Sequence, residues 1–199
     1  MEEPESKQTK TDKRKAILES TLQLISERGF HDTPMSLVAK ESGVAAGTIY
    51  RYFDNKEALI NELFIELKGA LLQAAVVDID EQDKPRKMLE KIWRNIFNYC
   101  IQNLEAMRFI EQFHNSPFQT PEIQTAVDKY YEPWIIQFET FVHKGIFRDI
   151  PFEMYTAFTY DLIIAFAKRH LNGTLIMDEQ NMKLAFNASW DLITAEGNK

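Results

Sequence analysis

The sequence has little of several residue types, and each shortage excludes a class of protein. One of its 199 residues is a cysteine, Cys100, so an internal disulfide and a multi-cysteine zinc site are both excluded. No stretch approaches the roughly 18 consecutive apolar residues that a transmembrane helix needs. The first fifteen residues, MEEPESKQTKTDKRK, lack the apolar run of a secretory signal. We therefore expect a cytoplasmic protein with no membrane segment.

Glycine and proline are also scarce, with seven of each. They fall mainly between stretches of helical apolar periodicity, and no run of alternating apolar and polar residues bounded by turns is visible. The composition, 45% hydrophobic and 27% charged, is typical of a folded globular protein. The sequence therefore predicts an all-α fold. Helices are expected over about 12–28, 35–42, 46–53, 57–77, 85–103, 104–114, 122–147, 152–171 and 179–195.

The net charge of −7 is unevenly distributed along the chain. Residues 7–56 hold nine basic and six acidic side chains, which gives +3, whereas residues 57–199 hold 14 basic and 21 acidic side chains, which gives −7. We call residues 7–56 the head and residues 57–199 the body. A basic head joined to an acidic body is compatible with a small DNA-binding module followed by a part that does not touch DNA.

The segment 42–53, SGVAAGTIYRYF, has more aromatic residues than a short core helix needs. Rings at positions 50, 52 and 53 of a helix point in different directions, so at least one is expected to make contacts outside the core. Two short helices that meet at Gly43, with a helix before and another after, match a helix-turn-helix. The side chains expected to project from it are Ala46, Gly47, Thr48, Tyr50, Arg51 and Tyr52.

The stretch from Thr33 to Leu59, TPMSLVAKESGVAAGTIYRYFDNKEAL, resembles the DNA-binding signature of the tetracycline-repressor (TetR/AcrR-type) family of transcriptional regulators. The resemblance extends over about 12–64. It implies an N-terminal helix-turn-helix domain followed by a variable helical body that binds a ligand and dimerises. The expected organisation is a flexible tail over 1–11, a DNA-binding domain over 12–56 and a ligand-binding and dimerisation domain over 57–199.

The resemblance also implies which residues meet DNA. Some of these residues carry a hydroxyl and one carries an ammonium. Such groups bind DNA phosphates and fix the position of the protein on the duplex without reading the base sequence. The residues implied for phosphate contact are Thr33, Thr48, Tyr50, Tyr52 and Lys56, and those implied for base edges are Ser36, Ala46, Gly47 and Arg51. Among them Arg51 is the side chain that can make a bidentate contact with guanine. The basic cluster 13–15, KRK, is either a solvated helix start or a further phosphate contact.

The body, over 85–171, holds most of the large aromatic side chains. The resemblance implies a ligand pocket among them, although ordinary core packing is the alternative for each residue. The candidates are Phe97, Arg108, Phe113, His114, Tyr130, Tyr131, Trp134 and Phe158. Because the histidines of the body are isolated from other ligand-forming side chains, neither a metal site nor a cofactor is expected.

The last two helices are apolar on more than one face, which favours a homodimer through residues 152–195. Two heads in successive major grooves then require a near-palindromic DNA operator. The predicted function is a dimeric repressor that a small apolar or aromatic ligand releases from its operator. The alternative is a DNA-binding architectural or scaffolding protein of the same fold that takes no ligand. No nucleophile elbow, phosphate loop or paired carboxylates stand out, so an enzyme is not expected.

Overall fold

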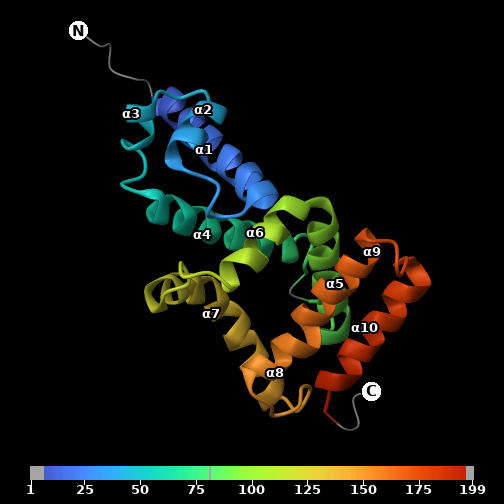
Figure 1. The fold of residues 1–199 in the computed structure, drawn as a ribbon. Coiled ribbons are helices and arrows are strands. Elements are labelled where there is room, and N and C mark those ends of the chain that lie inside the picture. Colours follow the sequence, from blue (N-terminus) through green and yellow to red (C-terminus); the bar gives the residue numbers. More distant parts are fainter. Residues whose placement is uncertain (1–6, 81, 196–199) are drawn as a thin grey trace. The chain divides into compact units, whose positions relative to one another are not determined.

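The fold is that of a computed structural model, which describes residues 7–80 and 82–195 (Figure 1). The prediction of an all-α chain with an N-terminal helix-turn-helix is confirmed, and the described residues include no β-strand beyond one isolated bridge, Phe147 with Thr194. Within the same residues, no helix is long and apolar enough to cross a membrane. The elements are α1 (Lys7–Arg28), α2 (Met35–Glu41), α3 (Ala46–Ile49), α4 (Lys56–Ala75), α5 (Pro85–Gln102), α6 (Leu104–His114), α7 (Pro121–His143), α8 (Phe152–Thr156), the π-helical turn η1 (Ala157–Asp161), α9 (Leu162–Leu171) and α10 (Glu179–Ile193).

The helices form two compact units. The first consists of the described residues up to Lys68 together with Glu105–Ala126, and the second consists of Gly69–Leu104 together with the described residues from Val127 onward. The first unit therefore contains α6 as well as the predicted DNA-binding helices. The domain boundaries predicted after residues 11 and 56 remain a prediction.

Aromatic side chains build the core of the first unit. The ring of Phe64 on α4 stacks on Phe113 of α6, with centroids 3.8 Å apart and planes 8° apart. Phe30, in the turn after α1, meets Phe109 of α6 edge-on at 5.5 Å. Because these pairs join the α1–α2 turn, α4 and α6, one apolar core supports the helices that precede and follow the helix-turn-helix.

Arg14 connects α1 to α4 within this unit. Its guanidinium forms ion pairs with Glu62 and, at 2.6 Å, with Glu66, and it lies 5.8 Å from the ring centre of Phe53. Burial disfavours its charged form, but the hydrogen bonds to the two glutamates outweigh burial and raise the pKa of Arg14. Arg14 is therefore paired with acidic side chains of α4, and both alternatives for the basic cluster 13–15 remain predictions.

The core of the second unit is centred on α5, which packs on η1, α9 and α10 (Figure 1). Trp93 of α5 is buried, and its indole N–H donates to Ser189 Oγ on α10 at 3.2 Å. Cys100 is also buried, as expected for a structural thiol. The guanidinium of Arg148 donates to the Thr194 carbonyl at 2.8 Å, which satisfies a backbone acceptor at the C-terminal end of α10.

The observed helix boundaries differ from the predicted ones at several ends. Helix α1 begins at Lys7, five residues before the expected start, and α3 ends at Ile49 rather than at residue 53. Helix α7 ends at His143 because Gly145 takes a φ of +66° and closes a Schellman turn, in which Ile146 N–H donates to Phe141 O at 2.9 Å. The helix expected over 152–171 is interrupted by η1.

Candidate nucleic-acid interface

The turn between α2 and α3 is set by Gly43. Helix α2 ends in a Schellman motif, in which Val44 N–H donates to Ala39 O at 3.0 Å and Gly43 N–H donates to Lys40 O at 3.2 Å. Gly43 has a φ of +69°, a conformation that is costly for residues with a Cβ atom. Val38, Ala39 and Ile49 are buried where α2 and α3 pack against each other.

The chain continues beyond α3 in tight turns rather than in α-helix. Arg51 N–H donates to Thr48 O at 3.0 Å, and Tyr52 N–H donates to Ile49 O at 3.1 Å, which are three-residue steps. Ile49 and Phe53 point into the core and are buried. The segment 46–53 therefore has one face held by the protein and one face turned to solvent.

Five of the nine predicted DNA contacts are exposed. Tyr50 is 54% exposed, which is unusual for an aromatic side chain in a folded head. The exposed members are Ser36, Ala46, Gly47, Tyr50 and Arg51, and Thr48 is half-buried. Their side chains come from α2, α3 and the turn after α3, which all belong to the first unit.

The other three predicted contacts are engaged inside the unit. Thr33 is 1% exposed, and its hydroxyl donates to Gly29 O at 2.9 Å. The ammonium of Lys56 donates to Phe30 O, and burial lowers its pKa, an effect that Asp32 partly offsets. The Tyr52 hydroxyl is buried and has no hydrogen-bond partner in the described part of the chain. Thr33 and Lys56 thus stabilise the α1–α2 turn through these hydrogen bonds. Their roles at DNA remain predictions.

Asn55 caps the N-terminus of α4. Its Oδ1 accepts from Ala58 N–H at 2.8 Å. Asp54 is an equally suitable cap by residue type, so the sequence alone could not choose between the two. Asn55 is an unpredicted support of the interface, because it sets where α4 starts and hence where Lys56 lies.

Alanine substitutions at two glycines of this segment are expected to have different effects on the free energy of unfolding. Gly43→Ala should lower the free energy of unfolding by about 1–2 kcal/mol, because the new Cβ would have to adopt a left-handed backbone. Gly47 is helical and open space surrounds the position that its Cβ would take. Gly47→Ala should therefore leave stability unchanged or raise it by up to about 1 kcal/mol. Urea unfolding followed by circular dichroism compares them, and equal losses would contradict the assignment.

The candidate ligand residues are divided between the two units. Arg108, Phe113 and His114 lie on α6 of the first unit, where Phe113 is fully buried in the core and the other two are exposed. The remaining five belong to the second unit: Phe97, Tyr130, Tyr131, Trp134 and Phe158. The role of all eight at a ligand remains a prediction.

Within the second unit the five candidates have different surroundings. Phe97 is buried and stacks on Trp93, with centroids 6.0 Å apart. Tyr130 on α7 is exposed, and its ring lies 3.5 Å from where a Cβ on Gly69 would be. Tyr131, Trp134 and Phe158 are half-buried. Phe97 therefore packs as an ordinary core residue, whereas the residues on α7 keep part of their apolar surface uncovered.

Comparisons with known proteins agree with this architecture. Residues 17–63 match the family model described as bacterial regulatory proteins, tetR family, and residues 86–194 match the model described as the tetracyclin repressor-like C-terminal domain. The crystal structure of a TetR family transcription regulator from Marinobacter aquaeolei VT8 has a TM-score of 0.90 and 26% identity, with 96% of this chain and all of that chain covered.

Two further similarities are to proteins of Bacillus subtilis. The fatty acid metabolism regulator protein of strain 168 is 38% identical over 73 residues, which are 37% of this chain. That match spans 38% of the relative's length, and the match to another curated relative spans 59%. The crystal structure of a transcriptional regulator FadR in complex with stearoyl-CoA has a TM-score of 0.68 and 19% identity, with 93% of this chain and 98% of that chain covered.

Proposed function

This chain belongs to the TetR family of DNA-binding transcriptional regulators, and we propose that it is a dimeric repressor which a small apolar or aromatic ligand releases from its operator. One observation carries the proposal. The outer side of 46–52 exposes Tyr50 and Arg51, while Ile49 and Phe53 hold the same segment to the core. An exposed aromatic beside an arginine, in the turn that ends a short helix after a glycine turn, suits a major groove lined by phosphates.

A ligand of low polarity is supported by the relatives and by composition. A Bacillus subtilis regulator similar in fold was solved with stearoyl-CoA, and a curated relative from that organism is named for fatty acid metabolism. In this chain the second unit contributes exposed or half-buried aromatic side chains from α7 and η1. Sites that bind apolar molecules are lined mainly by hydrophobic and aromatic side chains.

A dimer through the terminal helices is supported by the surface of α10. Leu184 is 59% exposed, Ala188 is exposed and Leu192 is 39% exposed. Residues four apart lie on one face of a helix, so these three form an apolar stripe, which we call the α10 stripe (Leu184, Ala188 and Leu192). Such a stripe on a helix of a second chain would complete an intersubunit helix bundle.

Regulation then follows from linkage. If operator and ligand favour different arrangements of the two heads, each weakens the binding of the other by the same factor, typically by about 1–3 kcal/mol. Two heads on one duplex would read half-sites about 34–36 Å apart, which makes the operator a near-palindrome.

The proposal is tested by selecting bound duplexes from a random DNA pool. A near-palindromic site should be recovered, and thermal-shift screening of acyl-CoA thioesters and aromatic acids should then find compounds that stabilise the protein and release that duplex. If a DNA site is selected but no compound releases the protein from it, the alternative of an architectural protein that takes no ligand is favoured. Failure to select any sequence would contradict sequence-specific DNA binding.

Two substitutions on the outer side of 46–52 should separate affinity from specificity. Tyr50→Ala removes one hydrogen bond to phosphate and should weaken all sites alike, by about 3- to 10-fold in Kd. Arg51→Ala should lower discrimination at one base position by about 1–3 kcal/mol. Fluorescence anisotropy with the selected duplex and its single-base variants measures both effects.

Lys144→Ala is the matched control for charge, since it removes one exposed positive charge from the end of α7. It should leave both affinity and base preference unchanged at moderate salt. Wild-type affinity in Tyr50→Ala together with an unchanged base profile in Arg51→Ala would refute the assigned interface.

A further inference from the structure

The indole N–H of Trp190 on α10 is a buried donor without an acceptor. The side chain is 3% exposed, and its Nε1 atom has no hydrogen-bond partner within residues 7–80 and 82–195. The indole of Trp93, by contrast, is also buried but donates to Ser189 Oγ at 3.2 Å. Buried tryptophan N–H groups normally have partners, because an unpaired donor loses its bond to water on folding. The N–H of Trp190 is therefore available to an acceptor from outside the chain.

Aromatic side chains connect this donor with a second one, the hydroxyl of Tyr155 on α8. Phe147, in the turn after α7, meets Trp190 edge-on at 6.1 Å and lies 5.5 Å from Tyr155, measured between ring centres. Phe138 of α7 lies 4.8 Å from the Tyr155 ring, and Phe152 of α8 lies 5.7 Å from it. All five residues belong to the second unit, and we call them the aromatic cluster (Phe138, Phe147, Phe152, Tyr155 and Trp190).

Backbone hydrogen bonds hold Phe147 against the end of α10. Arg148 N–H donates to Ile193 O at 2.8 Å, and Ala195 N–H donates to Ile146 O at 3.0 Å. Because these two bonds lie on either side of Phe147 in the sequence, its ring is kept in contact with both α8 and α10. The aromatic walls are therefore in place before any ligand binds, as is usual for sites that take small molecules.

The polar end of Tyr155 lies in surroundings that disfavour charge. The side chain is half-buried, and burial raises the pKa of its hydroxyl. The hydroxyl is therefore the inward end of the side chain, and near neutral pH it stays protonated and can donate a hydrogen bond. Surroundings that disfavour a phenolate disfavour a charged ligand for the same reason, because burial removes any ion from water.

Two arginines near Trp190 are already engaged by groups of the protein. Arg148 Nε donates to Thr194 O at 2.8 Å, at the C-terminal end of α10. Arg86 of α5 donates to Asn187 Oδ1 at 2.7 Å, and its guanidinium lies 5.4 Å from the ring centre of Trp190. A ligand anion would have to break one of these contacts to obtain a cationic partner.

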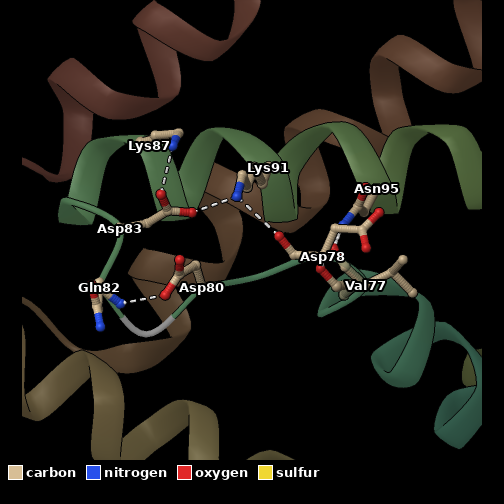
Figure 2. A network of polar contacts seen from close by, with 9 residues as sticks. Val77, Asp78, Asp80, Gln82, Asp83, Lys87, Lys91 and Asn95 are labelled. Carbon is tan, nitrogen blue, oxygen red and sulfur yellow. Dashed lines mark hydrogen bonds and ion pairs between the residues drawn. The ribbon is translucent and has the colours of Figure 1, made fainter.

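The next basic residues along α5, which packs on α10, are paired as well (Figure 2). Lys87 Nζ lies 2.7 Å from one carboxylate oxygen of Asp83, and Lys91 Nζ lies 2.5 Å from the other. Hydrogen bonds from the two lysines lower the pKa of Asp83 to about 2, so the carboxylate stays ionised and holds both lysines near neutral pH. The charges on this part of α5 are thus balanced within the protein, which favours an uncharged ligand at the aromatic cluster.

We propose that the aromatic cluster binds an uncharged ligand with an apolar body and one acceptor oxygen, such as that of a ketone or ester, to which Trp190 Nε1 and the Tyr155 hydroxyl donate. The inference rests on the proposed function, because it names the chemical class of the ligand. The aromatic rings cover the apolar body, and a carbonyl oxygen has two lone pairs for the two donors. A hydrocarbon would leave both donors unpaired, and an anion would lose its hydration without gaining a cation.

The test is the binding of probes of matched size to the full-length protein without DNA. Acetophenone and 2-octanone carry an acceptor oxygen, ethylbenzene and octane carry none, and benzoate and octanoate are anions. Calorimetric titration should give a Kd about 10-fold lower for each ketone than for the matched hydrocarbon or anion. In ¹⁵N-labelled protein, the ketones should also move the indole N–H resonance of Trp190 downfield, as expected when that N–H gains an acceptor.

Two variants each remove one donor and keep an aromatic ring. In Tyr155→Phe and in Trp190→Phe, the preference for ketones over hydrocarbons should fall to about 3-fold or less, whereas a packing role alone would leave that preference unchanged. Tyr99→Phe is the matched control, because Tyr99 is a half-buried tyrosine of α5 outside the aromatic cluster, and it should keep the wild-type preference. Should Trp190→Phe not fold, Tyr155→Phe and the Trp190 resonance of the wild type still decide.

Several outcomes would overturn the inference. They are equal affinity for ketones and hydrocarbons, a preference for the anions, an unchanged ketone preference in either variant, and failure of all six probes to bind. Each of them leaves the proposed function standing if another compound releases the operator. Conversely, if the ketones bind as expected but no duplex is selected from the random pool, the proposed function fails and the assigned site remains.

Discussion

Replacing Phe113 with alanine is expected to lower the free energy of unfolding by about 3–5 kcal/mol. The ring is fully buried, stacks on Phe64 at 3.8 Å and lies 6.3 Å from Phe109. Truncation would leave a cavity between α4 and α6 in a core that also supports the α1–α2 turn. Since domains are typically stable by about 5–15 kcal/mol, the loss would leave the first unit close to unfolding. Guanidinium unfolding followed by far-ultraviolet circular dichroism measures the change.

Two variants sharpen this expectation. Phe113→Leu keeps much of the apolar volume and should cost less than the alanine variant. Arg108→Ala on the same helix is exposed and should change stability by no more than about 0.5 kcal/mol. If Phe113 lined a ligand site rather than the core, its alanine variant would keep nearly the wild-type stability and lose response to the ligand instead. A measured loss below about 1 kcal/mol would therefore contradict the core assignment.

Phe113 also illustrates what the sequence could predict. Apolar periodicity correctly placed a helix over 104–114, because that pattern depends only on residues within the element. It could not tell which other helix α6 packs against, since partners distant in sequence determine that. The resemblance assigned everything after residue 56 to the body, and on that basis an aromatic of α6 was a ligand candidate. Its stacking on Phe64 places it in the core of the first unit.

Helix ends were predictable where one residue determines them. Gly43 closes a Schellman motif, and no other residue type takes its φ of +69° as readily, so the end of α2 was predicted to within one residue. The π-helical turn within 152–171 has no such marker, because the sequence there is compatible with continuous helix. Its form depends on packing against α5 and α10, which only the structure reveals.

For the candidate interface, the pattern predicted most of the side chains of 46–53 that face outward, since Ala46, Gly47, Tyr50 and Arg51 are exposed. It could not predict what the polar side chains do in the folded unit. Thr33 and Lys56 donate to the carbonyl groups of Gly29 and Phe30, and those bonds depend on how the α1–α2 turn folds over α4. A polar residue in a family signature can thus support the surface from inside as well as contact a partner.

Placing a carboxylate on the α10 stripe should abolish the proposed dimer. Leu184 and Leu192 are exposed in the single chain, so glutamate at either position should change the stability of the monomer by no more than about 0.5 kcal/mol. In a two-fold symmetric interface each substitution occurs twice, and burial of unpaired carboxylates costs several kcal/mol per ion. The Leu184→Glu, Leu192→Glu variant should therefore sediment as a folded monomer at micromolar concentration.

Loss of the dimer should remove most operator affinity, because a single head contacts one half-site. We expect the Kd for the selected operator to rise by about 10³-fold or more, toward the value for non-specific DNA. Lys183→Glu adds a carboxylate beside the α10 stripe and changes the charge more than either leucine substitution does, so it is a stringent control that should remain dimeric. Analytical ultracentrifugation and anisotropy on the same samples link the two effects. A variant that stays dimeric would locate the interface elsewhere, whereas a monomer with full operator affinity would show that one head suffices.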